Sequence, residues 1–112
     1  MTLREKQSLF VTLVAQLIQR ATDLGYELSF GETYRTPEQA ILNAKAGKGT
    51  KNSLHCDRLA IDLNLFKDGR FLGSTEDHRR LGEYWESLHP LARWGGRFND
   101  GNHYSIEHEG RK

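Results

Sequence analysis

The apolar residues at the start of the chain recur at helical spacing. Thr2, followed three residues later by Glu5, is typical of a capping box that opens a helix. Gly25 is suited to end this helix, because glycine often occupies the position just after a helical C-terminus. The pattern predicts an amphipathic helix whose core-facing stripe consists of Phe10, Leu13, Val14, Leu17, Ile18, Ala21 and Leu24.

Two later segments also begin like helices. Thr36 is a suitable N-cap and Pro37 suits the first helical position, so we expect a helix that ends near Ala46. The segment 46–52 is rich in glycine, lysine and threonine, and is predicted to be an exposed loop. Ser74 opens a third predicted helix, whose apolar stripe consists of Leu81, Tyr84, Trp85 and Leu88.

The clearest strand pattern runs over residues 58–66, where apolar and other residues alternate. Four aliphatic side chains share one face of this strand, whereas Asp62 belongs to the other face. A partly buried carboxylate costs free energy unless it is paired, so Asp62 is expected to need a partner. The alternatives are a metal ion, an ion pair with Arg35 or Arg58, and simple exposure on a solvent-facing side.

Shorter strand patterns complete the predicted sheet. Residues 26–30 alternate, and residues 67–69 (Lys-Asp-Gly) are a turn signal from which residues 70–72 return as the second strand of a hairpin. A last strand is expected over residues 103–107, after a Gly-rich loop. The order of these elements predicts an α+β fold with a small, mostly antiparallel sheet flanked by about three helices.

Length and composition are typical of one small globular domain. The 112 residues carry a formal charge of +1, which gives no basis for nucleic-acid binding through a basic field. The lone Cys56 excludes an internal disulfide. No apolar run reaches the ~18 residues of a membrane span, and polar residues interrupt the N-terminal apolar positions. We therefore expect neither membrane insertion nor a secretory signal.

Two imidazoles and two carboxylates are candidates for a zinc site. A bend before the predicted strand would bring His55 over the face that carries Asp62, and His103 follows a Gly-rich turn. Two histidines and one carboxylate form a three-ligand set that leaves one position for water, as a catalytic zinc site requires. Asp100 is either a turn-forming residue of its Asn-Asp-Gly-Asn sequence or a carboxylate that transfers the proton of such a water.

The remaining histidines and the cysteine are weaker candidates. His78 and His89 lie at the two ends of the third predicted helix and are expected to face solvent. His108 is at most an outer residue of the site. Cys56 is adjacent to His55, but successive side chains of an extended segment diverge, so the thiolate is not expected to share an ion with the imidazole.

Taken together, these residues resemble a known family. The pattern Ser-x-His-(six residues)-Asp begins at Ser53, and Trp-Gly-Gly-x-Phe-x-Asp-x-x-His begins at Trp94. Both are similar to patterns of the zinc peptidases of bacterial cell walls, which include D-alanyl-D-alanine carboxypeptidases and dipeptidases and the phage endolysins that are L-alanyl-D-glutamate peptidases. The segment 34–39 (Tyr-Arg-Thr-Pro-Glu-Gln) resembles the family's substrate-binding arginine segment, so the resemblance spans roughly residues 31–104.

The resemblance implies a hedgehog/DD-peptidase-like fold and a zinc ion held by His55, Asp62 and His103. It implies Asp100 as the general base, at the position where the carboxypeptidase and dipeptidase members carry glutamate. The endolysin-like members are similar to this chain in carrying aspartate there.

Arg35 and Ser53 complete the implied site. Arg35 would bind a substrate carboxylate or polarise the scissile carbonyl, and Ser53 would hydrogen-bond the ligand carboxylate or the substrate. The family often has glycine where this chain has Arg58. A bulky cation at this position is expected to narrow the cleft or to pair with an acidic group of the substrate.

The resulting hypothesis is a zinc-dependent peptidoglycan peptidase of phage or prophage origin that cleaves the L-alanyl-D-glutamate bond of the stem peptide. Aspartate at position 100, the small size and the missing export signal favour this bond. The alternatives are the same chemistry on D-alanyl-D-alanine, a non-catalytic zinc-containing phage tail or wall-binding module, and a metal-free α+β domain. We expect a monomer.

Residues 1–112 are expected to form a single peptidase domain without a separate wall-binding domain. The protein is expected to be made in the host bacterial cytoplasm without a signal peptide. It would then act on the cell wall after release by another protein.

Overall fold

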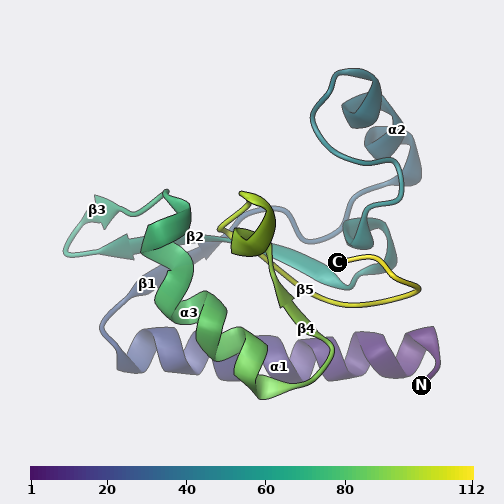
Figure 1. The fold of residues 1–112 in the computed structure, drawn as a ribbon. Helices are drawn as coiled ribbons and strands as arrows, with labels where there is room; N and C mark the ends of the chain where they lie inside the picture. The colour runs from purple at the N-terminus through teal and green to yellow at the C-terminus, as the bar shows by residue number, and fades with distance from the viewer.

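The computed structural model describes residues 1–112 and contains three α-helices and a five-stranded sheet (Figure 1). The helices are α1 (Leu3–Asp23), α2 (Pro37–Lys45) and α3 (Thr75–Leu88), and two short 3₁₀ helices span Leu54–Asp57 and Gly95–Phe98. The strands are β1 (Glu27–Phe30), β2 (Ala60–Lys67), β3 (Arg70–Phe71), β4 (Ala92–Trp94) and β5 (His103–Ile106). The predicted α+β class is confirmed.

The three helices begin at the predicted capping residues. The Thr2 hydroxyl accepts a hydrogen bond from the Glu5 amide, and the Glu5 carboxylate accepts one from the Thr2 amide. Ser74 and Asp77 form the same reciprocal pair at the start of α3, and the Thr36 side chain caps α2. Each cap satisfies amide donors that have no partner inside the helix, which stabilises it by about 1 kcal/mol. None of the helices combines the length and hydropathy that crossing a bilayer requires.

The sheet is antiparallel throughout and places β2 and β5 side by side. The strand order is β1-β2-β5-β4, and β3 pairs with β2 in the predicted hairpin. The short strand β4 was not predicted, because its three residues are too few to produce an alternating pattern. The strand expected to begin at residue 58 begins at Ala60, because Arg58 adopts a left-handed conformation with φ of 56° and ends the preceding 3₁₀ helix.

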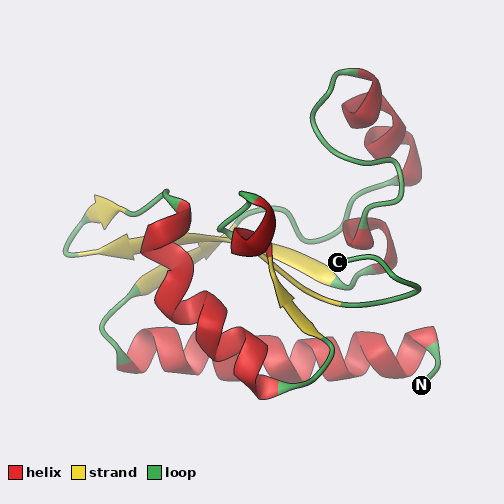
Figure 2. Cartoon of the chain, viewed as in Figure 1, coloured by secondary structure: helices red, strands yellow, loops and turns green.

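The helices α1 and α3 pack against one another, and both contact strands of the sheet (Figure 2). The aliphatic side chains of β2 belong to this core, and burying each one stabilises the fold by ~1.5–3 kcal/mol. The core leaves the opposite face of β2 available for Asp62. The largest core side chains include Phe10, Leu13, Leu17, Leu59, Leu63, Leu65, Leu81, Trp85, Trp94 and Tyr104.

The helix α2 and the loop that follows it project from this body (Figure 1). Only Ala40 of α2 is buried, and Ile41 and Leu42 are 45% and 59% exposed. The predicted loop over residues 46–52 is exposed along its whole length. The projecting segment therefore gains little from the core, and its loop residues Lys48, Gly49, Thr50 and Asn52 line a cavity together with His55.

Candidate metal centre

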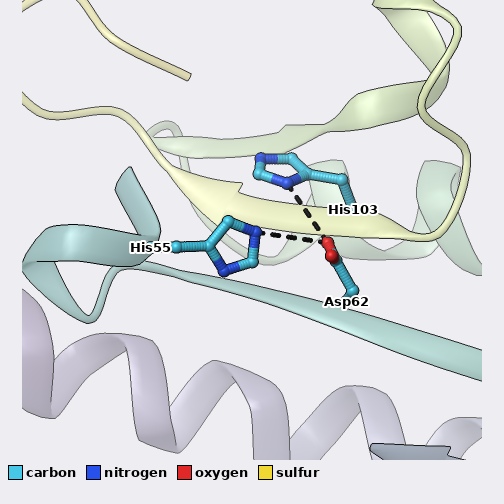
Figure 3. A group of neighbouring side chains, drawn as sticks. All are labelled: His55, Asp62 and His103. Carbon is cyan, nitrogen blue, oxygen red and sulfur yellow. Dashed lines mark ion pairs between the residues drawn. The ribbon is translucent and has the colours of Figure 1, made fainter. Parts of the chain in front are cut away.

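The pairing of β2 with β5 brings the first two residues of the centre together. Asp62 and His103 are direct partners in the antiparallel ladder. Residues opposed in this way have their side chains on the same face of the sheet. Both side chains point away from the helical core and toward His55 (Figure 3).

His55 is oriented by the 3₁₀ helix Leu54–Asp57. The Ser53 hydroxyl accepts a hydrogen bond from the His55 amide at 3.1 Å and caps this helix. The His55 ring donates from Nδ1 to the Thr33 carbonyl oxygen at 3.0 Å, because a carbonyl can only accept. This hydrogen bond leaves the lone pair of Nε2 directed toward Asp62, the arrangement that metal-binding histidines use.

The three side chains converge, and two of the three distances between their ligand atoms match a tetrahedral metal ion. Asp62 Oδ1 lies 3.3 Å from His55 Nε2 and 3.4 Å from His103 Nδ1, and the three ligand atoms all lie within 4.8 Å of one another. An ion about 2.0–2.1 Å from each of its tetrahedral ligands holds those ligands about 3.3 Å apart. Asp62 Oδ1 is buried and has no hydrogen-bond partner, which is costly unless a cation compensates it.

The charges of the centre also suit a metal. Burial raises the pKa of the Asp62 carboxyl, but the two imidazoles outweigh burial and lower this pKa to about 2. Burial lowers the pKa of the His55 ring, but the neighbouring Asp62 and the Thr33 carbonyl outweigh it and raise this pKa. Asp62 is therefore ionised at neutral pH, as a carboxylate ligand must be.

The Trp-Gly-Gly part of the second motif forms the turn before His103. A Cβ atom on Gly95 would lie 2.1 Å from the Asp100 carbonyl oxygen, and one on Gly96 would lie 2.2 Å from Cζ2 of Trp94. The Asp100 amide donates to the Gly95 carbonyl at 2.8 Å, and the His103 amide donates to the Asp100 carbonyl at 3.0 Å. Glycine is required at position 95 because the backbone of the turn lies directly against it, and at position 96 because the Trp94 ring does.

Asp100 lies beside the centre but outside the group of three ligands. Its Oδ2 is 3.8 Å from His103 Nδ1, and its side chain is 51% exposed. The turn is closed by backbone hydrogen bonds, so the carboxylate is not needed to hold it. Burial raises the pKa of Asp100, and the nearby His103 offsets part of this effect. A carboxylate with a raised pKa beside a metal centre is suited to proton transfer.

Arg35 is held at the centre by Glu32. Its Nε donates to Glu32 Oε1 at 2.8 Å, and its Nη2 contacts the same oxygen. This ion pair raises the pKa of Arg35, and the Arg35 amide also donates to the His55 carbonyl. Glu32 was not predicted as a site residue, because it is a single acid in a loop and no helical spacing relates it to Arg35. Because Arg35 pairs with Glu32, the alternative of an Arg35–Asp62 ion pair is wrong.

Arg58 lies outside the cleft. Its guanidinium stacks 4.1 Å from the centre of the Tyr34 ring and lines a separate apolar hollow. The expectation that it narrows the cleft or pairs there with a substrate group is therefore wrong, and it does not pair with Asp62 either. Its positive φ of 56° lies in the region that glycine adopts most easily.

Ser53 and Cys56 lie close to His55 in the sequence but are not among the three possible metal ligands. Ser53 lines the cleft, but its hydroxyl oxygen is bonded to the His55 amide, and it makes no hydrogen bond with Asp62. Cys56 is half-buried and does not belong to the group of His55, Asp62 and His103. Burial raises the pKa of the Cys56 thiol, so the thiolate is disfavoured.

His78 is buried, so the expectation that it faces solvent is wrong. It is 1% exposed, and its Nδ1 lies 2.8 Å from the Tyr104 hydroxyl in the core. Burial lowers the pKa of His78, with a small opposing effect of Asp77. His89 and His108 are half-buried, and neither joins the metal centre.

The buried His78 is expected to make the metal-free protein less stable in mild acid. Its pKa is lower in the folded than in the unfolded protein, so the unfolded state binds the proton first as the pH falls below about 6.5. The difference in unfolding free energy between wild type and His78→Gln should therefore narrow from about pH 7.5 to about pH 5.5 in urea titrations. If the difference in unfolding free energy stays constant between about pH 7.5 and about pH 5.5, the pKa of His78 is not lowered by folding.

The centre lies in a polar cleft of about 660 Å³. Its walls come from the Arg35 segment, the loop after α2, the His55 turn, the Asp100 turn and the last residues of the chain. Such a volume accommodates a short peptide segment. The lining residues are Arg35, Lys48, Gly49, Thr50, Asn52, Ser53, Leu54, His55, Asp62, Phe98, Asp100, His103, Gly110, Arg111 and Lys112.

Two solved structures share this fold. The L-Ala D-Glu endopeptidase ChiX of Serratia marcescens superposes with a TM-score of 0.63 at 21% identity, over 86% of this chain and 78% of that protein. The vancomycin-resistance D,D-pentapeptidase VanY of a VanB-type cassette, an E175A mutant in complex with Zn(II), superposes with a TM-score of 0.55 at 20% identity. That match covers 87% of this chain and 70% of VanY.

No protein-family model and no curated protein sequence matches the chain. The structural likenesses nevertheless establish the DD-peptidase-like fold that the residue patterns predicted.

Proposed function

We propose that the protein is a zinc-dependent peptidase that hydrolyses a bond of the peptidoglycan stem peptide, namely L-alanyl-D-glutamate. The observation that carries the proposal is the convergence of ligand atoms of His55, Asp62 and His103 within 4.8 Å of one another in a cleft. The fold shared with an L-Ala D-Glu endopeptidase and with a zinc-bound D,D-pentapeptidase supports it.

His55, Asp62 and His103 would hold the ion. When bound, zinc supplies Lewis acidity, which acidifies a water molecule and polarises a carbonyl group. The hydrogen bond from His55 Nδ1 to Thr33 fixes the ring so that Nε2 faces the centre. The ladder between β2 and β5 holds Asp62 and His103 in register.

Asp100 and Arg35 would act on the substrate. The Asp100 carboxylate would accept a proton from the attacking water and deliver it to the nitrogen of the leaving amine. Arg35, fixed by Glu32, would stabilise the negative charge that develops on the carbonyl oxygen, or bind a substrate carboxylate. Both side chains line the same cleft as the three proposed ligands, which supports these roles.

The choice of bond rests on Asp100 and on the fold. The resemblance associates aspartate at this position with L-alanyl-D-glutamate peptidases and glutamate with the carboxypeptidases. Hydrolysis next to D-alanine is the second candidate, because the shared fold with the D,D-pentapeptidase VanY favours it.

The proposal is tested by incubating the zinc-loaded protein with purified peptidoglycan and identifying the products by mass spectrometry. We expect two kinds of product. One has a new amino terminus on D-glutamate, and the other is a stem peptide that now ends at L-alanine. Release of D-alanine would instead support the second candidate. Zinc bound without any new amino terminus would contradict both, and would favour a non-catalytic zinc module.

A further inference from the structure

The cleft around the proposed metal centre is lined by four cationic side chains. Arg35, Lys48, Arg111 and Lys112 reach it from three separate parts of the chain. The only acidic side chains in its lining are Asp62 and Asp100, both of which have roles at the centre. The basic character is local, because the whole chain carries a formal charge of only +1.

Two of these cations, Arg35 and Arg111, form salt bridges with acidic residues that do not line the cleft. Arg35 pairs with Glu32. Arg111 pairs with Asp57 and also donates to the Asn52 carbonyl at 3.2 Å. These two arginines are fixed in position, and much of their charge is compensated.

Arg111 is further fixed by a tight turn. The backbones of His108 and Arg111 exchange two hydrogen bonds, at 3.2 and 3.0 Å. The two residues between them, Glu109 and Gly110, both have positive φ, at 51° and 78°, as the tightest hairpin turn requires. Lys112 directly follows this turn and lines the cleft.

Lys48 and Lys112 are the two cations without an acidic partner. Neither lysine takes part in an ion pair of the structure, and both are exposed. Lys112 Nζ lies 6.0 Å from the centre of the Phe98 ring, which also lines the cleft. The loop that carries Lys48 approaches the site, since a Cβ atom on Gly49 would lie 3.7 Å from Arg35 Nη1.

We propose that Lys48 and Lys112 bind a free carboxylate of the substrate, so that the cleft selects peptides with a free glutamyl carboxylate beside the cleaved bond. The inference rests on the proposed peptidase function and specifies its substrate class. An L-alanyl-D-glutamyl unit retains a free carboxylate when its other carboxyl group is bonded to the next residue. An ammonium group that has no partner in the protein is available to form a charge-assisted hydrogen bond with such a group.

The test compares two synthetic stem peptides that are identical except that the free glutamyl carboxylate of one is a carboxamide in the other. We expect wild type to cleave the carboxylate peptide with a kcat/KM about tenfold higher, as one charge-assisted hydrogen bond provides. The double variant Lys48→Ala/Lys112→Ala should lose this preference. Its kcat/KM should fall for the carboxylate peptide and stay unchanged for the carboxamide peptide. Lys48→Arg/Lys112→Arg should keep it.

Lys51→Ala is the matched control, because Lys51 belongs to the same exposed loop but does not line the cleft. It should retain the full preference. Equal cleavage of the two peptides by wild type would overturn the inference, and so would a double variant that keeps the preference.

Binding of the same two peptides to Asp100→Asn, measured by calorimetry, separates this inference from the proposed function. The inference is supported if Asp100→Asn binds the carboxylate peptide more tightly than the carboxamide peptide, and if this difference disappears when Lys48→Ala and Lys112→Ala are added to the same protein. This holds even if wild type cleaves neither peptide. In that case the peptidase proposal fails and the anion site stands. Equal binding of the two peptides overturns the inference whether or not cleavage occurs.

Discussion

Replacing Asp100 with asparagine is expected to reduce peptide hydrolysis by roughly 10²- to 10⁴-fold, the usual contribution of a general base. Asparagine has nearly the same shape but cannot accept the proton. The fold should not change, because the Asp100 side chain is half-exposed and the turn is closed by backbone hydrogen bonds. The bound zinc should also be retained, since Asp100 is not one of the three converging ligands.

The measurements are kcat/KM on a stem peptide, zinc content by elemental analysis, and the thermal midpoint. Asp68→Asn is a suitable control, because Asp68 is an exposed carboxylate in the β2–β3 turn whose φ of 52° asparagine also adopts readily. The control should keep full activity. An Asp100→Asn variant as active as the wild type would remove the proposed base, whatever its metal content.

Replacing Asp62 with asparagine is expected to weaken zinc binding by more than the ~10–100-fold that loss of an outer-shell partner costs. The substitution removes the only negative charge among the three converging ligands. In wild type, free zinc at about 1,000 times its dissociation constant should stabilise the folded state by about 4 kcal/mol. The variant should lose most of this stabilisation.

The measurement is the thermal midpoint of each protein with zinc and with a chelator, together with a zinc titration. His89→Ala is the control, because His89 is a half-buried histidine that does not belong to the metal group. It should respond to zinc as the wild type does. If zinc raises the midpoint of Asp62→Asn as much as that of wild type, the ion binds elsewhere.

The helices and the main strand were predictable because their signals lie within short stretches of sequence. The capping residues Thr2, Thr36 and Ser74 each mark the start of a helix in the structure. Period-two alternation assigned Asp62 to the face opposite the aliphatic core residues, and its burial pattern agrees. Neither inference needed a contact between distant segments.

The surroundings of the site were harder to predict. Arg58 was expected at the cleft, yet it stacks on Tyr34 outside it, because a left-handed residue ends the 3₁₀ helix. The buried pairing of His78 with Tyr104 also depends on how α3 packs against β5, which no local pattern reports. Glu32, which fixes Arg35, was missed because a single acid in a loop has no distinctive spacing.

The sequence by itself determined the three helices and the main strand, the face on which Asp62 lies, and a motif set that resembles zinc peptidases. Only the tertiary structure decided that Asp62 is opposed to His103, that Thr33 orients His55, and that Lys48 and Lys112 share a cleft with them. The physical reason is that helix caps and alternation act between neighbouring residues. Strand register and side-chain convergence instead depend on packing between segments far apart in the chain.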